Sequence, residues 1–190
     1  PGTFAYSPVA GTILGVGAAW PLSVTFTPTD TTLYVAATTT VKIAVVKATP
    51  IITWPAPADL VYPAPLGALQ LNARANVAGS FSYNRSTGTV LTAGNGQTLS
   101  VAFTPADSAT YNNAAASVTI NVLKGTPTIA WNTPATVTLP ATLTATQLNA
   151  TASVPGTLVY NPVAGTTLTS GPRTLAVTLT PTDASYLPVT

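Results

Sequence analysis

Apolar and polar residues alternate with a period of two along much of the chain. In residues 98–104, Leu99, Val101 and Phe103 fall on one side of an extended chain and polar side chains on the other, and residues 117–122 repeat this pattern. Such alternation is typical of strands in an antiparallel sheet with one buried and one solvated face. No apolar period of 3.6 residues persists between the prolines, so helices are not expected. The sequence therefore predicts an all-β protein.

Turn-forming residues divide the chain into short strands. Strands are expected at residues 50–54, 59–62, 70–77, 80–84, 98–104 and 117–122, with Gly, Pro, Asn and Ser residues in the turns between them. About seven short strands at close spacing are typical of a β-sandwich of the immunoglobulin type. We therefore expect this architecture for the repeating unit described next.

The sequence pattern returns every 77 residues. Residues that recur at this spacing include Gly2, Gly79 and Gly156, and also Tyr6, Tyr83 and Tyr160. The third copy lacks one residue between Gly165 and Leu175. A fixed period of this length indicates a tandem array of structural units, each of which is one immunoglobulin-like module.

We expect three such repeats along the chain. The C-terminal part of one repeat covers 1–47, a complete repeat covers 48–124, and a repeat without its last strand covers 125–190. The links at 47–50 and 124–127 are short and end in proline. Because such links bend little, we expect the repeats to form an elongated rod.

The outer repeats are incomplete when they are aligned on the middle one. Pro1 aligns with Ala78 and Thr190 with Ala115, so apolar residues of the first repeat, such as Phe4 and Val41, would lack much of their covering layer. Leaving several such side chains wet forfeits on the order of 10 kcal/mol. We therefore expect the partners to be neighbouring immunoglobulin-like repeats in a long fibre. They would come from a continuing chain or, less favoured, from an identical chain that donates strands.

Composition narrows the possible functions. Charged residues make up only 5% of the sequence, and the six Lys and Arg residues are scattered, which argues against nucleic-acid binding. There is no Cys or His, so thiolate metal sites and the common nucleophile–histidine pairs are excluded. The sequence has no apolar run of about 18 residues, the length of a membrane span. We expect neither an enzyme nor a cofactor.

Three of the four acidic residues lie in a recurring motif. Each copy follows an alternating strand with Thr-Pro, then an aspartate, then a tyrosine: Asp30 and Tyr34, Asp107 and Tyr111, and Asp183 and Tyr186. In sandwich folds a tyrosine hydroxyl near such a corner binds a backbone group upstream. An aspartate in a turn accepts hydrogen bonds from backbone N–H groups. We interpret these six residues as structural corners.

Calcium binding is the main alternative for the corners. Calcium takes six to eight oxygen ligands, normally including several carboxylates. Each corner has a single aspartate, and the only other acid, Asp59, is replaced by Thr136 in the next repeat. Catalysis is still less favoured, because no second carboxylate lies nearby in sequence to form an acid–base pair. The sequence therefore predicts no metal site and no catalytic residue.

The tryptophans raise a second alternative. Trp54 and Trp131 end the first strand of their repeats, next to apolar residues, and are expected to pack inside. Trp20 is expected to point outward and is the candidate for an external contact. If the tryptophans were exposed on one face, the chain would be an array of carbohydrate-binding modules.

The segments "TPTIAW", "QLNATA", "GTLVYNP" and "LTPTDASY", with their counterparts in the other copies, resemble the tandem bacterial Ig-like repeats of the mostly-bacterial (MBG) type. The resemblance covers all 190 residues. It implies an immunoglobulin-like sandwich, an extracellular or cell-surface location, and a structural role in a bacterial stalk, adhesin or filament. The family pattern has no catalytic residues to transfer.

Overall fold

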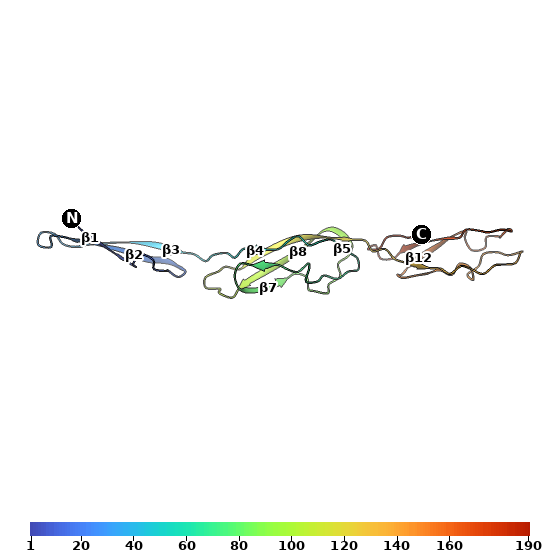
Figure 1. Ribbon diagram of the computed structural model, residues 1–190, viewed down its shortest axis with the longest axis horizontal. Coiled ribbons are helices and arrows are strands. Elements are labelled where there is room, and N and C mark those ends of the chain that lie inside the picture. Colours follow the sequence, from blue (N-terminus) through green and yellow to red (C-terminus); the bar gives the residue numbers. More distant parts are fainter. The chain divides into compact units, whose positions relative to one another are not determined.

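The computed structural model describes residues 1–190 and contains thirteen strands (Figure 1). They are β1 (Gly2–Ser7), β2 (Gly17–Pro28), β3 (Ala37–Val45), β4 (Ile52–Thr53), β5 (Leu60–Val61), β6 (Arg74–Ala75), β7 (Gly79–Tyr83), β8 (Gly94–Pro105), β9 (Ala114–Leu123), β10 (Ile129–Ala130), β11 (Thr151–Ala152), β12 (Gly156–Asn161) and β13 (Ala176–Pro181). The prediction of an all-β protein is confirmed. The structure contains no helix with the length and apolar character of a membrane span.

The chain forms two compact units whose limits differ from the 77-residue period. The first unit comprises Pro1–Trp54, Ala73–Ser82 and Val101–Ala116, and the second comprises Pro55–Asn72, Tyr83–Ser100 and Ser117–Thr190. Residues of the middle repeat, 48–124, thus belong to both units. The repeat boundaries expected from the sequence stay a prediction.

The first unit contains a three-stranded antiparallel sheet in the order β1-β2-β3. Phe4 on β1 lies opposite Phe26 on β2, with ring centroids 5.0 Å apart. Phe4 and Val41 are each 63% exposed. The same unit contains the short antiparallel pair β4–β6, which joins Ile52 to Ala75.

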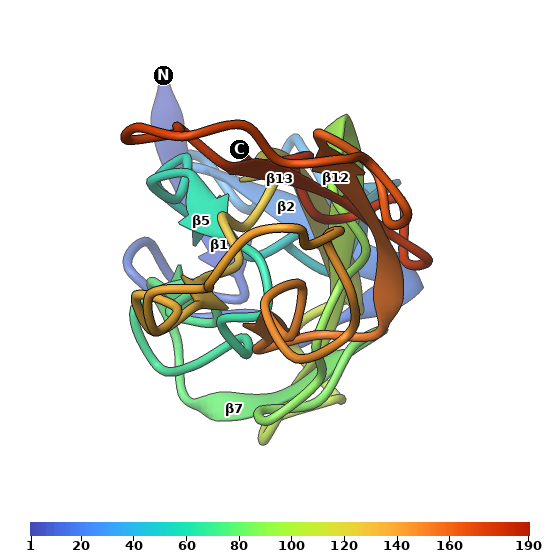
Figure 2. The ribbon, with the colours of Figure 1, turned by 90° about the vertical axis from the view of Figure 1, so that its right-hand side faces the viewer.

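The second unit contains two antiparallel pairs, β10–β11 and β12–β13. Figure 2 shows β12 and β13 side by side. Leu158 on β12 lies opposite Leu179 on β13, and Leu179 is fully buried. Leu179 also exchanges two backbone hydrogen bonds with Val189, of 2.8 and 3.1 Å, so the chain returns antiparallel along the other edge of β13.

A four-stranded sheet has the order β5-β9-β8-β7. Its inward residues Leu99, Val101 and Phe103 are 1–2% exposed, and Ile120 and Val122 on β9 are equally buried. The alternation read from the sequence is therefore confirmed for β8 and β9. One pair differs from the antiparallel expectation, because β5 runs parallel to β9. Alternation reports which face of a strand is buried but not the direction of its neighbour.

Two expected strands are much shorter than the sequence indicated. Instead of a strand over 70–77, only Arg74–Ala75 is paired. The N–H groups of Gln70 and Leu71 both donate to the carbonyl of Gly67, which closes a turn where the strand was expected to begin. Residues 50–54 contribute only Ile52–Thr53. A proline on each side, which cannot donate to a sheet, limits this strand.

Candidate functional site

The aspartate of the first corner is held by its own turn. Oδ1 of Asp30 accepts hydrogen bonds from the hydroxyl of Thr32 at 2.7 Å and from the N–H groups of Thr32 and Leu33 at 3.0 and 3.2 Å. These bonds, that of the Thr32 hydroxyl first, hold the pKa of Asp30 below its ordinary value. The carboxylate is thus used within the turn.

The other two corners repeat this arrangement. Oδ1 of Asp107 accepts from the N–H groups of Ala109 and Thr110, both at 3.1 Å. Oδ1 of Asp183 accepts from the N–H of Ser185 at 2.8 Å. Hydrogen bonds from Thr110, before those from Ala109, lower the pKa of Asp107. Each aspartate therefore stabilises its own turn, because its side chain accepts hydrogen bonds from backbone N–H groups of that turn.

The second corner also binds the chain segment that enters its own repeat. Ala48 pairs in parallel with Tyr111: its N–H donates to the carbonyl of Thr110 at 3.0 Å, and its carbonyl accepts from the N–H of Asn112 at 2.8 Å. Lys47 adds a bond from Nζ to the carbonyl of Ser108 at 2.6 Å. The corner thus anchors the link between repeats by backbone hydrogen bonds.

The third corner binds the next link in the same way. The N–H of Gly125 donates to the carbonyl of Ser185 at 3.0 Å, and the N–H of Leu187 donates to the carbonyl of Gly125 at 2.9 Å. Gly125 and Tyr186 form a parallel bridge, as Ala48 and Tyr111 do. The same parallel bridge and the same pair of backbone bonds therefore recur at the two links.

A residue of the middle repeat completes the third corner. The hydroxyl of Tyr62 donates to Oδ2 of Asp183 at 2.7 Å, and the rings of Tyr62 and Tyr186 meet edge to face with centroids 5.0 Å apart. The bond from Tyr62 is the main cause of the lowered pKa of Asp183, and the same bond raises the pKa of Tyr62. Ser185 is buried, and its Oγ accepts from the N–H of Ala93 at 3.2 Å.

The hydroxyl bond expected of a tyrosine corner occurs at a different tyrosine. The hydroxyl of Tyr160 accepts from the N–H of Ala150, ten residues upstream, at 2.9 Å. The ring of Tyr160 also packs edge to face on Trp131, whose Nε1 donates to the carbonyl of Gln147 at 2.9 Å. Sequence reasoning missed this role, although the recurrence of tyrosine at 77-residue spacing was a signal for it.

The indole N–H of Trp20 makes a hydrogen bond within the chain. Its ring is 39% exposed, but Nε1 donates to the carbonyl of Gly15 at 2.7 Å. Gln97 lies 77 residues later and donates from Nε2 to the carbonyl of Thr92, also at 2.7 Å. Both side chains close the turn that precedes a long strand. The other tryptophans are less accessible, since Trp54 is 9% exposed and Trp131 is half-buried.

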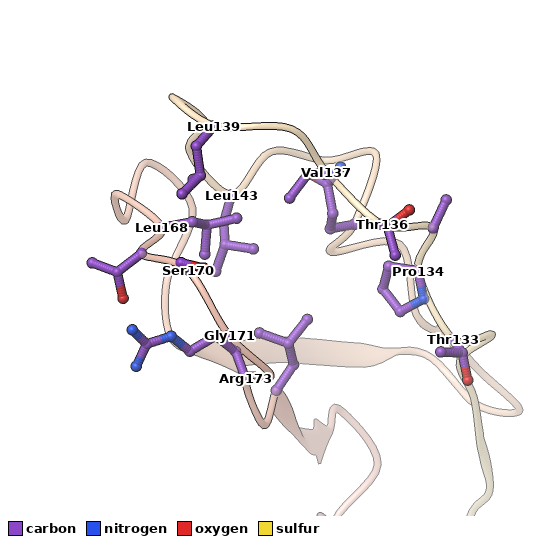
Figure 3. Close-up of a pocket in the computed structure, with 14 residues that line it drawn as sticks. Thr133, Pro134, Thr136, Val137, Leu139, Leu143, Leu168, Ser170, Gly171 and Arg173 are labelled. Carbon is purple, nitrogen blue, oxygen red and sulfur yellow. The ribbon is translucent and has the colours of Figure 1, made fainter.

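The third repeat has no such closure, and an open cavity of about 360 Å³ lies there. In Figure 3, Val137, Leu143 and Leu168 surround the cavity, and Arg173 is its one charged side chain. β13 begins only at Ala176, and the segment before it is one residue shorter than in the other copies. The lining has no acid and no nucleophile–base pair, so it offers apolar contact rather than chemistry.

The remaining acid, Asp59, also has a local partner. Its Oδ1 accepts from Nδ2 of Asn121 at 3.0 Å, and Oδ1 of Asn121 accepts from the N–H of Gly96 at 2.9 Å. The structure contains no group of three or more His, Cys, Asp or Glu side chains that could hold a metal ion. The four acidic residues are therefore separate from one another, each in its own hydrogen-bond network.

Comparisons of the chain with protein-family models, curated proteins and solved structures found no match.

Proposed function

We propose that the chain is a structural segment of an extracellular bacterial stalk, adhesin or filament, built from tandem immunoglobulin-like repeats. One observation supports this role above the others. The aspartate motif, which contains most of the acidic residues, binds its own turn and the link that enters the repeat. A motif used in this way joins and orients repeats and has no free carboxylate pair for catalysis.

The arrangement of the middle repeat's strands in two separate sheets supports the immunoglobulin-like part of the proposal. The middle repeat has a short β4–β6 pair and a separate four-stranded sheet, β5-β9-β8-β7, as a two-sheet sandwich requires. Residues next to the short pair, Trp54 and Ala73, are buried, as are Val101 and Phe103 on β8. This is the burial expected when two sheets cover a common core.

The extracellular location and the bacterial source rest on the resemblance to MBG-type repeats. The absence of Cys does not exclude secretion, since a secreted form would depend on its cores for stability rather than on disulfides. The partners we propose are neighbouring repeats of the same kind in a fibre. The three aspartate corners would then act as the recurring joints of the fibre.

Small-angle X-ray scattering of the chain tests the tandem arrangement. A compact globule of 190 residues has a radius of gyration of about 16 Å. A rod of successive repeats predicts a value well above this, with a scattering profile typical of an elongated particle. A measured radius of gyration near that of the globule would refute the rod.

The carbohydrate-binding alternative is weakened by the tryptophans. Stacking on sugars needs flat exposed rings, whereas Trp54 is buried and Trp131 is half-buried with its N–H bonded internally. Only Trp20 offers an exposed face. Titration with a panel of soluble glycans distinguishes the two functions, because a structural segment predicts no saturable binding. Binding that is lost in Trp20→Ala would favour the alternative.

A further inference from the structure

The second compact unit extends across a repeat boundary. It combines residues 55–72, 83–100 and 117–123 of the middle repeat with the whole of the third repeat. A purely modular chain would divide at the link 124–127, between the repeats. Hydrogen bonds of Tyr62 and of Ser185 with the opposite repeat lie across this link.

Tyr62 contacts the third corner with both its hydroxyl and its ring. Its hydroxyl donates to Asp183, and its ring packs on the ring of Tyr186. Its backbone N–H donates to the carbonyl of Leu123 at 2.9 Å, which fixes the residue beside the link. Ala93 adds a second bond across the boundary, from its N–H to the hydroxyl of Ser185. Ser185 is 5% exposed, so this hydroxyl needs a partner.

The link has a glycine, Gly125, at the point of this contact. A Cβ on Gly125 would overlap the carbonyl oxygen of Tyr62 and would lie 2.9 Å from the ring of Tyr186. No side chain is tolerated there without movement of the backbone or the ring. At the corresponding position of the preceding link the residue is Ala48. Glycine at position 125 therefore permits the close approach of Tyr62 and Tyr186.

Tyr62 is not repeated at the equivalent position of the third repeat. The residue 77 positions after Tyr62 is Leu139, which is 44% exposed and has no hydroxyl to donate. The two repeats therefore present different groups at the same place in the fold. A surface with Tyr62 suits an aspartate corner, whereas a surface with Leu139 does not.

From these observations we infer that the surface around Tyr62 is a docking site for the aspartate corner of the following repeat. We name Tyr62, Gly125 and Asp183–Tyr186 the joint. The joint couples the two repeats, so that opening of the third corner and release of Tyr62 occur together. This inference rests on the proposed structural function and adds to it a residue-level rule for which repeats are rigidly joined.

Amide hydrogen exchange on the full chain tests the joint with Tyr62→Phe, which keeps the ring and removes the hydroxyl. Exchange of the Gly125, Leu187 and Ala93 amides should become roughly two- to tenfold faster, the range for loss of one hydrogen bond. The Ala48 and Asn112 amides of the other link should be unchanged, because their hydrogen bonds involve no residue of the joint. Unchanged exchange at all three joint amides would overturn the inference.

A double-mutant cycle supplies the matched control. The effects of Tyr62→Phe and Asp183→Ala on the Gly125 amide should be less than additive, because both remove the same bond. Asp107→Ala removes an equivalent aspartate without a tyrosine partner, so its effect should be additive with that of Tyr62→Phe. Additivity in both cycles would overturn the inference.

The glycine is tested separately from the hydroxyl. Gly125→Ala should accelerate exchange at Leu187 and Ala93, whereas Ala48→Gly should leave these two amides unchanged. Exchange at the joint that is indifferent to Gly125→Ala would contradict the close approach. Failure of these tests would refute the joint alone, since the scattering experiment measures the tandem arrangement without reference to Tyr62.

Discussion

Replacing Tyr160 by phenylalanine is expected to destabilise the third repeat, whereas the same change at Tyr186 is not. The hydroxyl of Tyr160 accepts the hydrogen bond of the Ala150 N–H at 2.9 Å. Ala150 is 8% exposed, so water has little access to the N–H that the substitution leaves behind. The edge-to-face contact with Trp131 needs only the ring and persists in the variant. The substitution therefore isolates one hydrogen bond.

The magnitude follows from the burial of the orphaned group. A buried donor that loses its partner costs about 1–3 kcal/mol, more than the net value of an exposed hydrogen bond. Tyr186 makes no hydroxyl hydrogen bond in the structure, and phenylalanine keeps its ring contact with Tyr62. The expected cost of Tyr186→Phe is close to zero. The two variants lie in the same repeat, so each is the control for the other.

Native-state hydrogen exchange measures the effect locally, which is necessary because a chain of several repeats need not unfold in one step. In Tyr160→Phe, the amides of β12 and β13 should exchange with an opening free energy lower by about 1–3 kcal/mol. In Tyr186→Phe they should match the parent. Equal protection in Tyr160→Phe and the parent, or a larger loss in Tyr186→Phe, would refute this assignment of the corner hydroxyl.

Four further predictions concern Gly79, Trp20, the corner aspartates and metal dependence. A Cβ on Gly79 would overlap the ring of Phe103, so Gly79→Ala should cost about 1–3 kcal/mol in denaturant unfolding, and an unchanged midpoint would contradict this. Trp20→Phe loses the bond to Gly15 and should speed amide exchange in the β2–β3 hairpin, whereas Trp20→Gln should restore protection, since Gln97 closes the equivalent turn. The three corner aspartates have lowered pKa values in the folded chain. Their contribution to stability is therefore complete above the unfolded pKa of about 4 and is lost as pH falls through the lower folded values, which an acid titration of the melting temperature measures. The same melting temperature should not change on addition of EDTA, and a drop that calcium restores would point to a metal site.

The long strands could be predicted because their pattern has a direct physical cause. Alternation in 98–104 places every second residue against the core, and Leu99, Val101 and Phe103 are buried as predicted. The ends of the short strands could not be predicted in this way. At Gln70, two backbone bonds to Gly67 form a turn within a segment that also alternates, and alternation alone cannot distinguish the two.

The partners of the corner residues were only partly predictable. An aspartate that follows a proline in a turn bonds to N–H groups two and three residues later, so the acceptor role of Asp107 follows from local sequence. The bond between Tyr62 and Asp183 joins residues 121 positions apart, and no local rule indicates it. Trp20 is exposed, as strand alternation predicts, but alternation cannot indicate that its Nε1 donates to the carbonyl of Gly15.

Pulling the chain between two marker domains in a force spectrometer tests the structural role most directly. A load-bearing segment predicts discrete force peaks, with at least one that releases the length of a 77-residue repeat, about 250–280 Å when fully extended. A chain that extends smoothly, with no peak before the marker domains unfold, would contradict a structural role for these repeats.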